Sequence, residues 1–189
     1  MSNLITKTTE LAMSVTLAYI SKGDTVIDAT CGSGRDTASL ALAAGAEGHV
    51  YAFDIQEKAI DMTRERLAAN GLGNVELIMK SFTSMGEFIL DGSASAVVFN
   101  LGYLPGGDHS ITTTADETLK GLSCALEAIR PGGIVTIVLY DGHEAGAIEK
   151  KRVIKWAEEL DPHKYHAAFV SLINQDKHPP EILWITAKK

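Results

Sequence analysis

Hydrophobic and polar positions follow two patterns that take turns along the chain, and together they predict strands separated by helices. Five short apolar runs predict strands at residues 25–28, 49–53, 75–79, 94–99 and 134–140. Around them, apolar residues recur every three or four positions, which predicts helices over residues 4–21, 38–44, 56–70, 84–90, 112–130 and 144–160. This alternation is typical of a parallel sheet covered by helices on both faces.

The end of the chain breaks this alternation. Two further strands are predicted at 165–173 and 182–186, and no helix fits between them, so we expect an antiparallel hairpin. Arg-Pro-Gly-Gly at 130–133 predicts a sharp turn before the fifth strand. Five strand–helix units followed by a hairpin predict an α/β fold of the class I methyltransferase type. This fold is Rossmann-like, with a seven-stranded, mostly parallel sheet. No repeat or linker is evident, so residues 1–189 are expected to form one domain.

Composition and charge narrow the classes of protein to consider. The 189 residues are 46% hydrophobic and 22% charged, which is ordinary for one globular domain with a sizeable core. The net charge of −7 argues against a broad, non-specific nucleic-acid binder but leaves room for a local basic patch. The apolar runs are too short to span a membrane, and we expect no export signal. Cys31 and Cys124 give no disulfide framework, so a reducing cytoplasm is the expected location.

The loop after the first strand carries the first candidate chemistry. Gly32 and Gly34 predict a tight turn whose backbone N–H groups face a ligand. Asp54 follows Gly34 by twenty residues, where nucleotide-binding folds place a carboxylate for a ribose. The third glycine of a dinucleotide fingerprint is absent, and Asp28 suits a cationic ligand better than a pyrophosphate. The pattern therefore favours S-adenosylmethionine, with its sulfonium and ammonium groups, over NAD. The alternative is that Asp28 only caps the amides of its own loop.

A second candidate is the loop after the fourth strand, which should lie across the ligand crevice from the first. Asn100 can accept hydrogen bonds from a substrate amine, and Tyr103 can stack on a flat base. Asp108 and His109 in the same loop can receive or relay a proton. The alternative is structural, with Asn100 capping a turn and the other side chains making local contacts. No histidine has the spacing of a metal ligand, so no metal site is predicted.

Four segments carry a resemblance to a known family. They are DATCGSGRDT at 28–37, DIQ at 54–56, NLGYLPGGDH at 100–109, and INQ at 173–175 followed by two prolines. With them, nearly the whole chain resembles the MnmM-type family, long labelled rRNA methylases. The resemblance implies a tRNA methyltransferase that uses S-adenosylmethionine, releases S-adenosylhomocysteine, and N-methylates the 5-aminomethyl group of the wobble (2-thio)uridine. The chain departs from the family pattern at Ser33, at Ser81 and Phe82, and in lacking a histidine in its first helix.

The residues and the resemblance together define an expected active site. Direct in-line methyl transfer is expected, in which Asn100 and the Leu101 carbonyl orient the amine and Tyr103 stacks on the uracil. Asp108 or His109 would accept the proton. The residues expected to contact the cofactor are Asp28, Thr30, Cys31, Gly32, Ser33, Gly34, Asp36, Thr37, Asp54, Ile55, Gln56, Ser81, Phe82, Asn100 and Leu101.

The expected partner is the anticodon stem-loop of a tRNA, because its single-stranded wobble base can splay out at little cost. Arg35, Lys150, Lys151 and Arg152 are expected to meet its phosphates, although the last three also suit a solvated helix face. A homodimer is one way for a small acidic enzyme to frame the stem. Two other functions stay open. One is methylation of rRNA or of a small-molecule amine, and the other is non-catalytic binding of S-adenosylmethionine.

Overall fold

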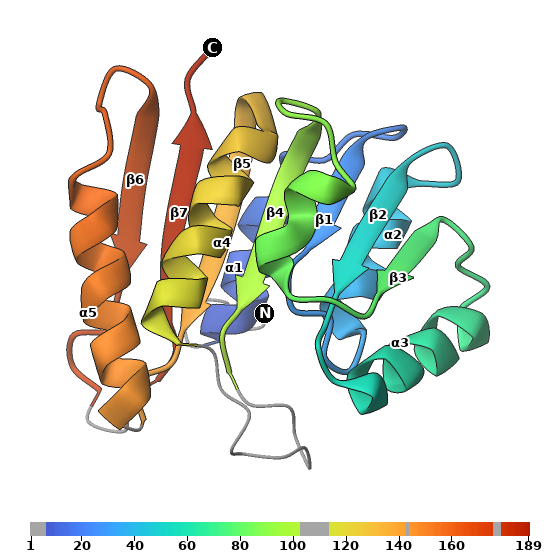
Figure 1. The fold of residues 1–189 in the computed structure, drawn as a ribbon, viewed down its shortest axis with the longest axis horizontal. Helices are drawn as coiled ribbons and strands as arrows, with labels where there is room; N and C mark the ends of the chain where they lie inside the picture. The colour runs from blue at the N-terminus through green and yellow to red at the C-terminus, as the bar shows by residue number, and fades with distance from the viewer. Residues whose placement is uncertain (1–6, 103–113, 143, 176–178) are drawn as a thin grey trace.

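A single mixed sheet forms the centre of the molecule (Figure 1). The computed structural model describes residues 7–102, 114–142, 144–175 and 179–189. The strand order is β3-β2-β1-β4-β5-β7-β6, in which β7 runs antiparallel to both neighbours and the other pairs are parallel. The strands are β1 Thr25–Asp28, β2 His49–Phe53, β3 Val75–Ile78, β4 Ala94–Asn100, β5 Ile129–Leu139, β6 Tyr165–Val170 and β7 Glu181–Ala187.

Helices cover both faces of the sheet. In Figure 1, α1 and α2 lie behind it, whereas the 3-10 helix η2, α4 and α5 lie in front. On the rear face, α3 packs beside α2 and contributes Ile60 to a small cluster with Ala52 of β2. The helices are α1 Thr8–Leu17, α2 Arg35–Ala44, α3 Glu57–Ala69, η2 Phe82–Glu87, α4 Ala115–Ala128 and α5 Glu144–Glu158.

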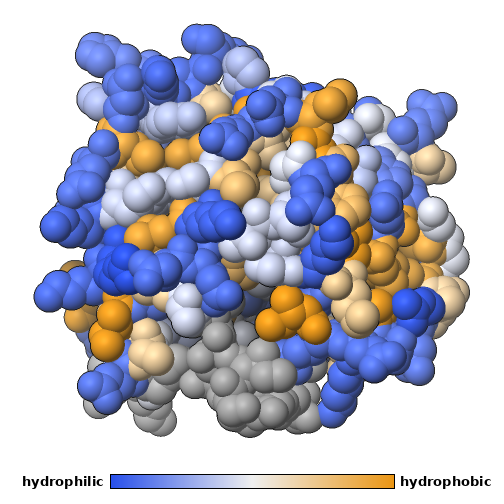
Figure 2. Space-filling model, viewed as in Figure 1, coloured by the Kyte–Doolittle hydropathy of each residue, from blue (hydrophilic) through white to orange (hydrophobic). Residues whose placement is uncertain are grey.

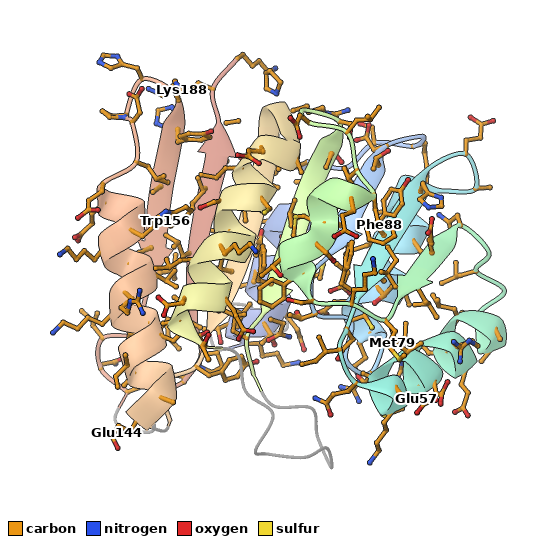
Figure 3. The ribbon with its side chains drawn as sticks, in the orientation of Figure 1. Glu57, Met79, Phe88, Glu144, Trp156 and Lys188 are labelled. Carbon is orange, nitrogen blue, oxygen red and sulfur yellow. The ribbon has the colours of Figure 1, made fainter. Side chains whose placement is uncertain are left out.

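The core lies on both sides of β4, because successive side chains of a strand point to opposite faces. Phe99 joins the cluster beneath η2, α4 and α5, whereas Val98 joins the cluster beneath α1 and α2. On the front face, the Phe88 ring meets the Phe53 ring edge-on with centroids 5.7 Å apart, and Trp156 packs against the same cluster (Figure 3). Hydrophilic residues cover most of the outer surface of the helices on this face, η2, α4 and α5 (Figure 2). Burial on both faces explains the continuous apolar run of β4.

The predicted order of elements, the parallel strands and the C-terminal hairpin are confirmed. The short helix predicted at 84–90 is present but shifted towards the N-terminus, as a 3-10 helix over Phe82–Glu87. The turn predicted at 130–133 lies inside β5. Between the pairs Ala94–Ile129 and Ala96–Ile134, β5 advances by five residues and β4 by only two. The extra residues therefore form an irregularity within the strand rather than a turn before it.

The parallel strands bring the loops that follow β1, β2 and β4 to one edge of the sheet, the lower edge in Figure 1. After β1 the chain adds β2 and β3 on one side of β1. It then crosses back and adds β4 on the other side of β1, so the order of strands reverses between β1 and β4. Ligands of open α/β sheets bind in the crevice at this reversal of strand order. Within the described residues, no helix is both long and apolar enough to cross a membrane.

Candidate active site

The glycine loop after β1 is held in place by α3. Gly34 has a φ of 76°, and a Cβ atom at this position would lie 2.8 Å from the Thr63 backbone. Glycine is therefore needed at 34 both for its left-handed conformation and for the close approach of a helix. The Thr63 hydroxyl donates to the Gly32 carbonyl at 3.1 Å, and Arg66 Nε donates to the Ser33 carbonyl at 2.7 Å. These two α3 residues fix the loop, and the sequence analysis did not identify them.

Asp28 lies at the end of β1 and is almost completely buried. Its carboxylate accepts hydrogen bonds from the Thr37 hydroxyl at 2.6 Å and from the Thr30 N–H at 3.2 Å. Burial raises the pKa of Asp28 to about 7, and the nearby charges of Asp36 and Asp54 add to this effect. Asp28 thus makes the local loop contacts that the alternative interpretation required, and it also carries a charge that a cationic ligand would stabilise.

Asp54 lies across the loop from Asp28, at the end of β2. Its two carboxylate oxygens accept the N–H groups of Gly32 and Gln56, each at 3.0 Å. Burial raises the pKa of Asp54, although these backbone hydrogen bonds oppose the shift. The neighbouring Ile55 is 58% exposed, as is Met79 after the adjacent strand β3. Two exposed apolar side chains beside a fixed carboxylate suit a nucleoside, with ribose at Asp54 and the base against the apolar surface. The sequence analysis did not include Met79.

Asn100 ends β4 and faces the loop of β1. Its backbone N–H donates to the Thr30 hydroxyl at 2.8 Å. Its side-chain Nδ2 donates to Asp36 Oδ2 at 3.3 Å. The side-chain oxygen Oδ1 is buried and has no hydrogen-bond partner among the described residues. Leaving a buried acceptor unpaired costs about 1–3 kcal/mol, so a ligand donor that reached this oxygen would relieve that cost.

Tyr140 forms part of the same edge and was not predicted. It follows β5, and its ring lies so close to Gly102 that a Cβ there would be 3.0 Å from the ring. Burial raises the pKa of the Tyr140 hydroxyl, and the charge of Asp36 adds to the shift. Leu101, which directly follows Asn100, is buried and donates its N–H to the carbonyl of Val138 in β5 at 3.1 Å. The sequence did carry a signal for Tyr140, because a residue that directly follows a strand parallel to β4 must lie at this edge of the sheet.

Other predicted residues have different surroundings. Tyr103, Asp108 and His109 lie outside the described residues, so their roles stay predictions. Ser81 caps η2 by accepting the Thr83 N–H at 3.3 Å. Phe82 is buried in the front core, with its ring centroid 5.4 Å from that of Phe99. The proposed contact of Phe82 with the cofactor therefore stays a prediction, and packing accounts for its side chain.

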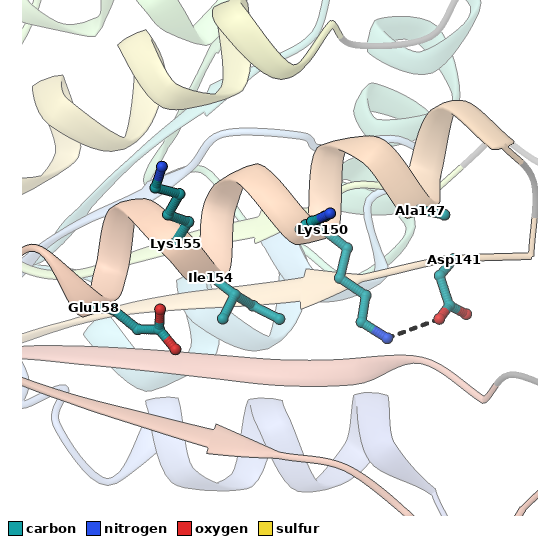
Figure 4. A pocket seen from close by; sticks show the side chains of 7 residues that line it. Asp141, Ala147, Lys150, Ile154, Lys155 and Glu158 are labelled. Atoms are coloured by element: carbon teal, nitrogen blue, oxygen red, sulfur yellow. Dashed lines mark hydrogen bonds and ion pairs between the residues drawn. The ribbon is translucent and has the colours of Figure 1, made fainter.

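The basic cluster on α5 is partly neutralised by carboxylates. Lys150 forms an ion pair with Asp141 at 2.7 Å (Figure 4). It forms a second ion pair with Glu181. Arg152 pairs at 2.6 Å with an exposed carboxylate at the start of α4. Lys151 is exposed and has no ion-pair partner in the described parts of the chain. In this cluster, Lys151 is consequently better placed than Lys150 to attract an anion.

The residues at the crevice fit S-adenosylmethionine. Three largely buried carboxylates, Asp28, Asp36 and Asp54, lie at one sheet edge, and burial raises the pKa of each. Arg35 opposes the shift of Asp36 only, so the three charges together would be stabilised by a further cationic partner. A sulfonium and an ammonium group would supply that partner, whereas a pyrophosphate would be repelled. Among the described residues, no cluster of side chains could hold a metal ion. The fold and this site are those of a class I S-adenosylmethionine-dependent methyltransferase.

Comparison with known proteins agrees with this class. Residues 50–186 match the family described as "Putative rRNA methylase", and the chain belongs to that family. A structure from Clostridium thermocellum described as "putative rRNA-methylase" has a TM-score of 0.93 and 40% identity, covering 95% of this chain and 97% of that one. A Streptococcus mutans methyltransferase, solved with S-adenosylhomocysteine, has a TM-score of 0.87 and 33% identity over 95% and 97% of the two chains.

A curated relative comes from Arabidopsis thaliana and is named tRNA (mnm(5)s(2)U34)-methyltransferase, chloroplastic. It is 38% identical over an alignment 184 positions long, which covers 92% of this chain and 67% of the relative. The MnmM-type resemblance, the fold class and the S-adenosylmethionine cofactor are thereby confirmed.

The raised pKa of Asp28 predicts how the stability of the cofactor-free protein depends on pH. The folded value is about 7 and the ordinary value is 3.8, so between these pH values the folded state holds a proton that the unfolded state has lost. The free energy of unfolding should therefore fall as pH rises from about 4 to 7. Asp28→Asn should flatten this fall, as measured by urea denaturation across the pH range.

The same shift predicts that affinity for S-adenosylmethionine rises as pH increases towards and through 7, because the cation favours ionised Asp28. In Asp28→Asn this rise should be much smaller, as measured by isothermal titration calorimetry. If stability and affinity depended on pH equally in the wild type and in Asp28→Asn, Asp28 would not be the group with the raised pKa that meets the cofactor cation.

Proposed function

We propose that this protein is a tRNA methyltransferase that transfers a methyl group to the 5-aminomethyl nitrogen of the wobble (2-thio)uridine. The observation that carries the proposal is Asn100 Oδ1, a buried acceptor without a partner among the described residues, at the cofactor edge of β4. A primary amine can donate to this oxygen and still keep its lone pair free. The activity in the name of the Arabidopsis relative supports the same reaction.

The residues of this chain supply binding and orientation. S-adenosylmethionine, when bound, supplies an electrophilic methyl group. Asp54 would hold its ribose and Asp28 would balance its positive charge. Asn100 Oδ1, together with the Leu101 carbonyl, would accept the amine hydrogens and direct the nitrogen lone pair. Such alignment accounts for much of the rate enhancement in a transfer of this kind.

The proposed substrate site extends beyond the described residues. Tyr103 would stack on the uracil, and Asp108 or His109 would take up the proton. Exposed Arg35 at the start of α2 and Lys151 on α5 would contact phosphates of the anticodon stem-loop. The cytoplasmic location and the homodimer stay predictions, the first supported by free Cys31 and Cys124.

Two other functions make different predictions. A methyltransferase for rRNA or for small amines would use the same Asn100 acceptor but would not require an anticodon loop. A non-catalytic binding protein would hold the cofactor without transferring its methyl group. The activity in the name of the Arabidopsis relative favours the catalytic functions, and the oxygen of Asn100 offers a substrate amine an acceptor that has no partner among the described residues.

Asn100→Ala should retain cofactor affinity and lose methyl transfer by a factor of about 100 or more, because the amine loses its orienting acceptor. Transfer of labelled methyl groups would be measured to an anticodon stem-loop that contains 5-aminomethyl-uridine. A stem-loop with unmodified uridine, rRNA and small amines serve as competing substrates. Normal transfer by Asn100→Ala would overturn the role of Asn100, and transfer to another substrate alone would overturn the tRNA assignment.

Lys151→Glu should weaken binding of the stem-loop and reduce the slope of log affinity against log salt by roughly 1, because one phosphate contact is lost. Lys188→Glu has the same change of charge but lies near the C-terminus, at the opposite edge of the sheet (Figure 3). It should leave affinity and slope nearly unchanged. Equal losses in the two variants would indicate a general effect of net charge instead of a contact surface on α5.

A further inference from the structure

Asp36 is an acid of the cofactor site, and it also contacts the side chain of Asn100. Asp36 Oδ2 accepts a hydrogen bond from Asn100 Nδ2 at 3.3 Å, and this is the side-chain contact that fixes the amide among the described residues. Asp36 lies in the first turn of α2, on the helix that the glycine loop introduces. The contact therefore joins the loop after β1 to the end of β4, across the crevice.

The chemistry of the two groups makes this contact directional. An ionised carboxylate can only accept hydrogen bonds, whereas the two ends of an amide are a donor and an acceptor of similar shape. The Asn100 NH2 group must consequently face Asp36, and Oδ1 must point away from it. Oδ1 is the atom that is buried without a partner. If the amide were rotated by 180°, it would place its oxygen against a carboxylate and its donors where a substrate amine needs an acceptor.

We infer that Asp36 is the positioning residue for the acceptor of the substrate amine: it holds the Asn100 amide in the one orientation that presents Oδ1. This inference rests on the proposed function for the identity of the amine. The charge of Asp36 has a second consequence. When the amine nitrogen gains a methyl group it becomes positively charged, and a carboxylate on the far side of the amide stabilises that charge. An alcohol or thiol that is deprotonated before the transfer gives a neutral product, and it would gain no such benefit.

The direct test needs neither RNA nor cofactor. In ¹⁵N NMR spectra, the side-chain amide of Asn100 is assigned by its absence in Asn100→Ala. In the wild type, one of its protons should be shifted downfield and should exchange slowly with water. Asp36→Ala should remove both properties, and Asp36→Asn, which keeps a neutral acceptor, should restore part of them. Asp91→Ala, which removes an exposed acid before β4, should change neither. Unchanged Asn100 signals in Asp36→Ala would overturn the inference.

A double-mutant cycle gives the functional test. Asp36→Ala should lower kcat at saturating cofactor by about 10- to 100-fold, in addition to any loss of cofactor affinity. In the Asn100→Ala background the same change should have little further effect, because Asp36 acts through Asn100. Independent, multiplying losses, or a loss confined to cofactor affinity, would show that Asp36 acts on another group. If the wild type methylates no anticodon stem-loop, the proposed function fails, and the NMR comparison still decides the role of Asp36.

Discussion

Crowding of three carboxylates at one largely buried edge of the sheet is the constraint on which the site depends. Asp28, Asp36 and Asp54 come from the end of β1, the start of α2 and the end of β2, and burial raises the pKa of each. No arrangement of like charges away from water is stable without compensation. In this chain, backbone N–H groups and hydroxyls of the glycine loop compensate in part, and a cationic cofactor would supply the rest.

The rest of the site follows from how these charges are held. The Asp54 carboxylate fixes the glycine loop through the Gly32 N–H, and α3 supports the same loop from behind through Thr63. Asp36 accepts a hydrogen bond from Asn100, and its charge also raises the pKa of Asp28, so the cofactor side and the substrate side share one charged group. A methyl transfer from sulfur to nitrogen moves a positive charge from one side of this edge to the other. The fixed carboxylates favour positive charge at both ends of the path.

Much of the fold was predictable because it depends on local patterns. The apolar run of β4 and the alternation of strands with helices gave the sheet, and the short link before β7 predicted the antiparallel end. The position of residues 130–133 within β5 could not be predicted, because Pro-Gly-Gly reads as a turn until the pairing of β4 with β5 is known. The 3-10 form of η2 was not predicted either, and its first residue, Phe82, packs against Phe99 of β4, a contact that only the folded chain shows.

The site was predictable where a residue follows a strand or forms part of a motif, as for Asp28, Asp54 and Asn100. It was not predictable where function depends on a neighbour from elsewhere in the chain. Thr63 belongs to no motif, and only the folded chain brings it to this edge. Met79 and Tyr140 directly follow β3 and β5, so their place at this edge was signalled in the sequence, although neither forms part of a motif. The contact of Asp36 with Asn100 spans 64 residues and two loops, so spacing alone could not reveal it.

The central claim is that this site methylates an amine on the wobble uridine of tRNA. The most direct measurement is mass-spectrometric nucleoside analysis of tRNA from cells with and without the protein. The account predicts that loss of the protein depletes the 5-methylaminomethyl nucleoside and accumulates its 5-aminomethyl precursor, and that Asn100→Ala fails to restore the product. An unchanged nucleoside profile in cells without the protein, with no other enzyme of this specificity present, would contradict it.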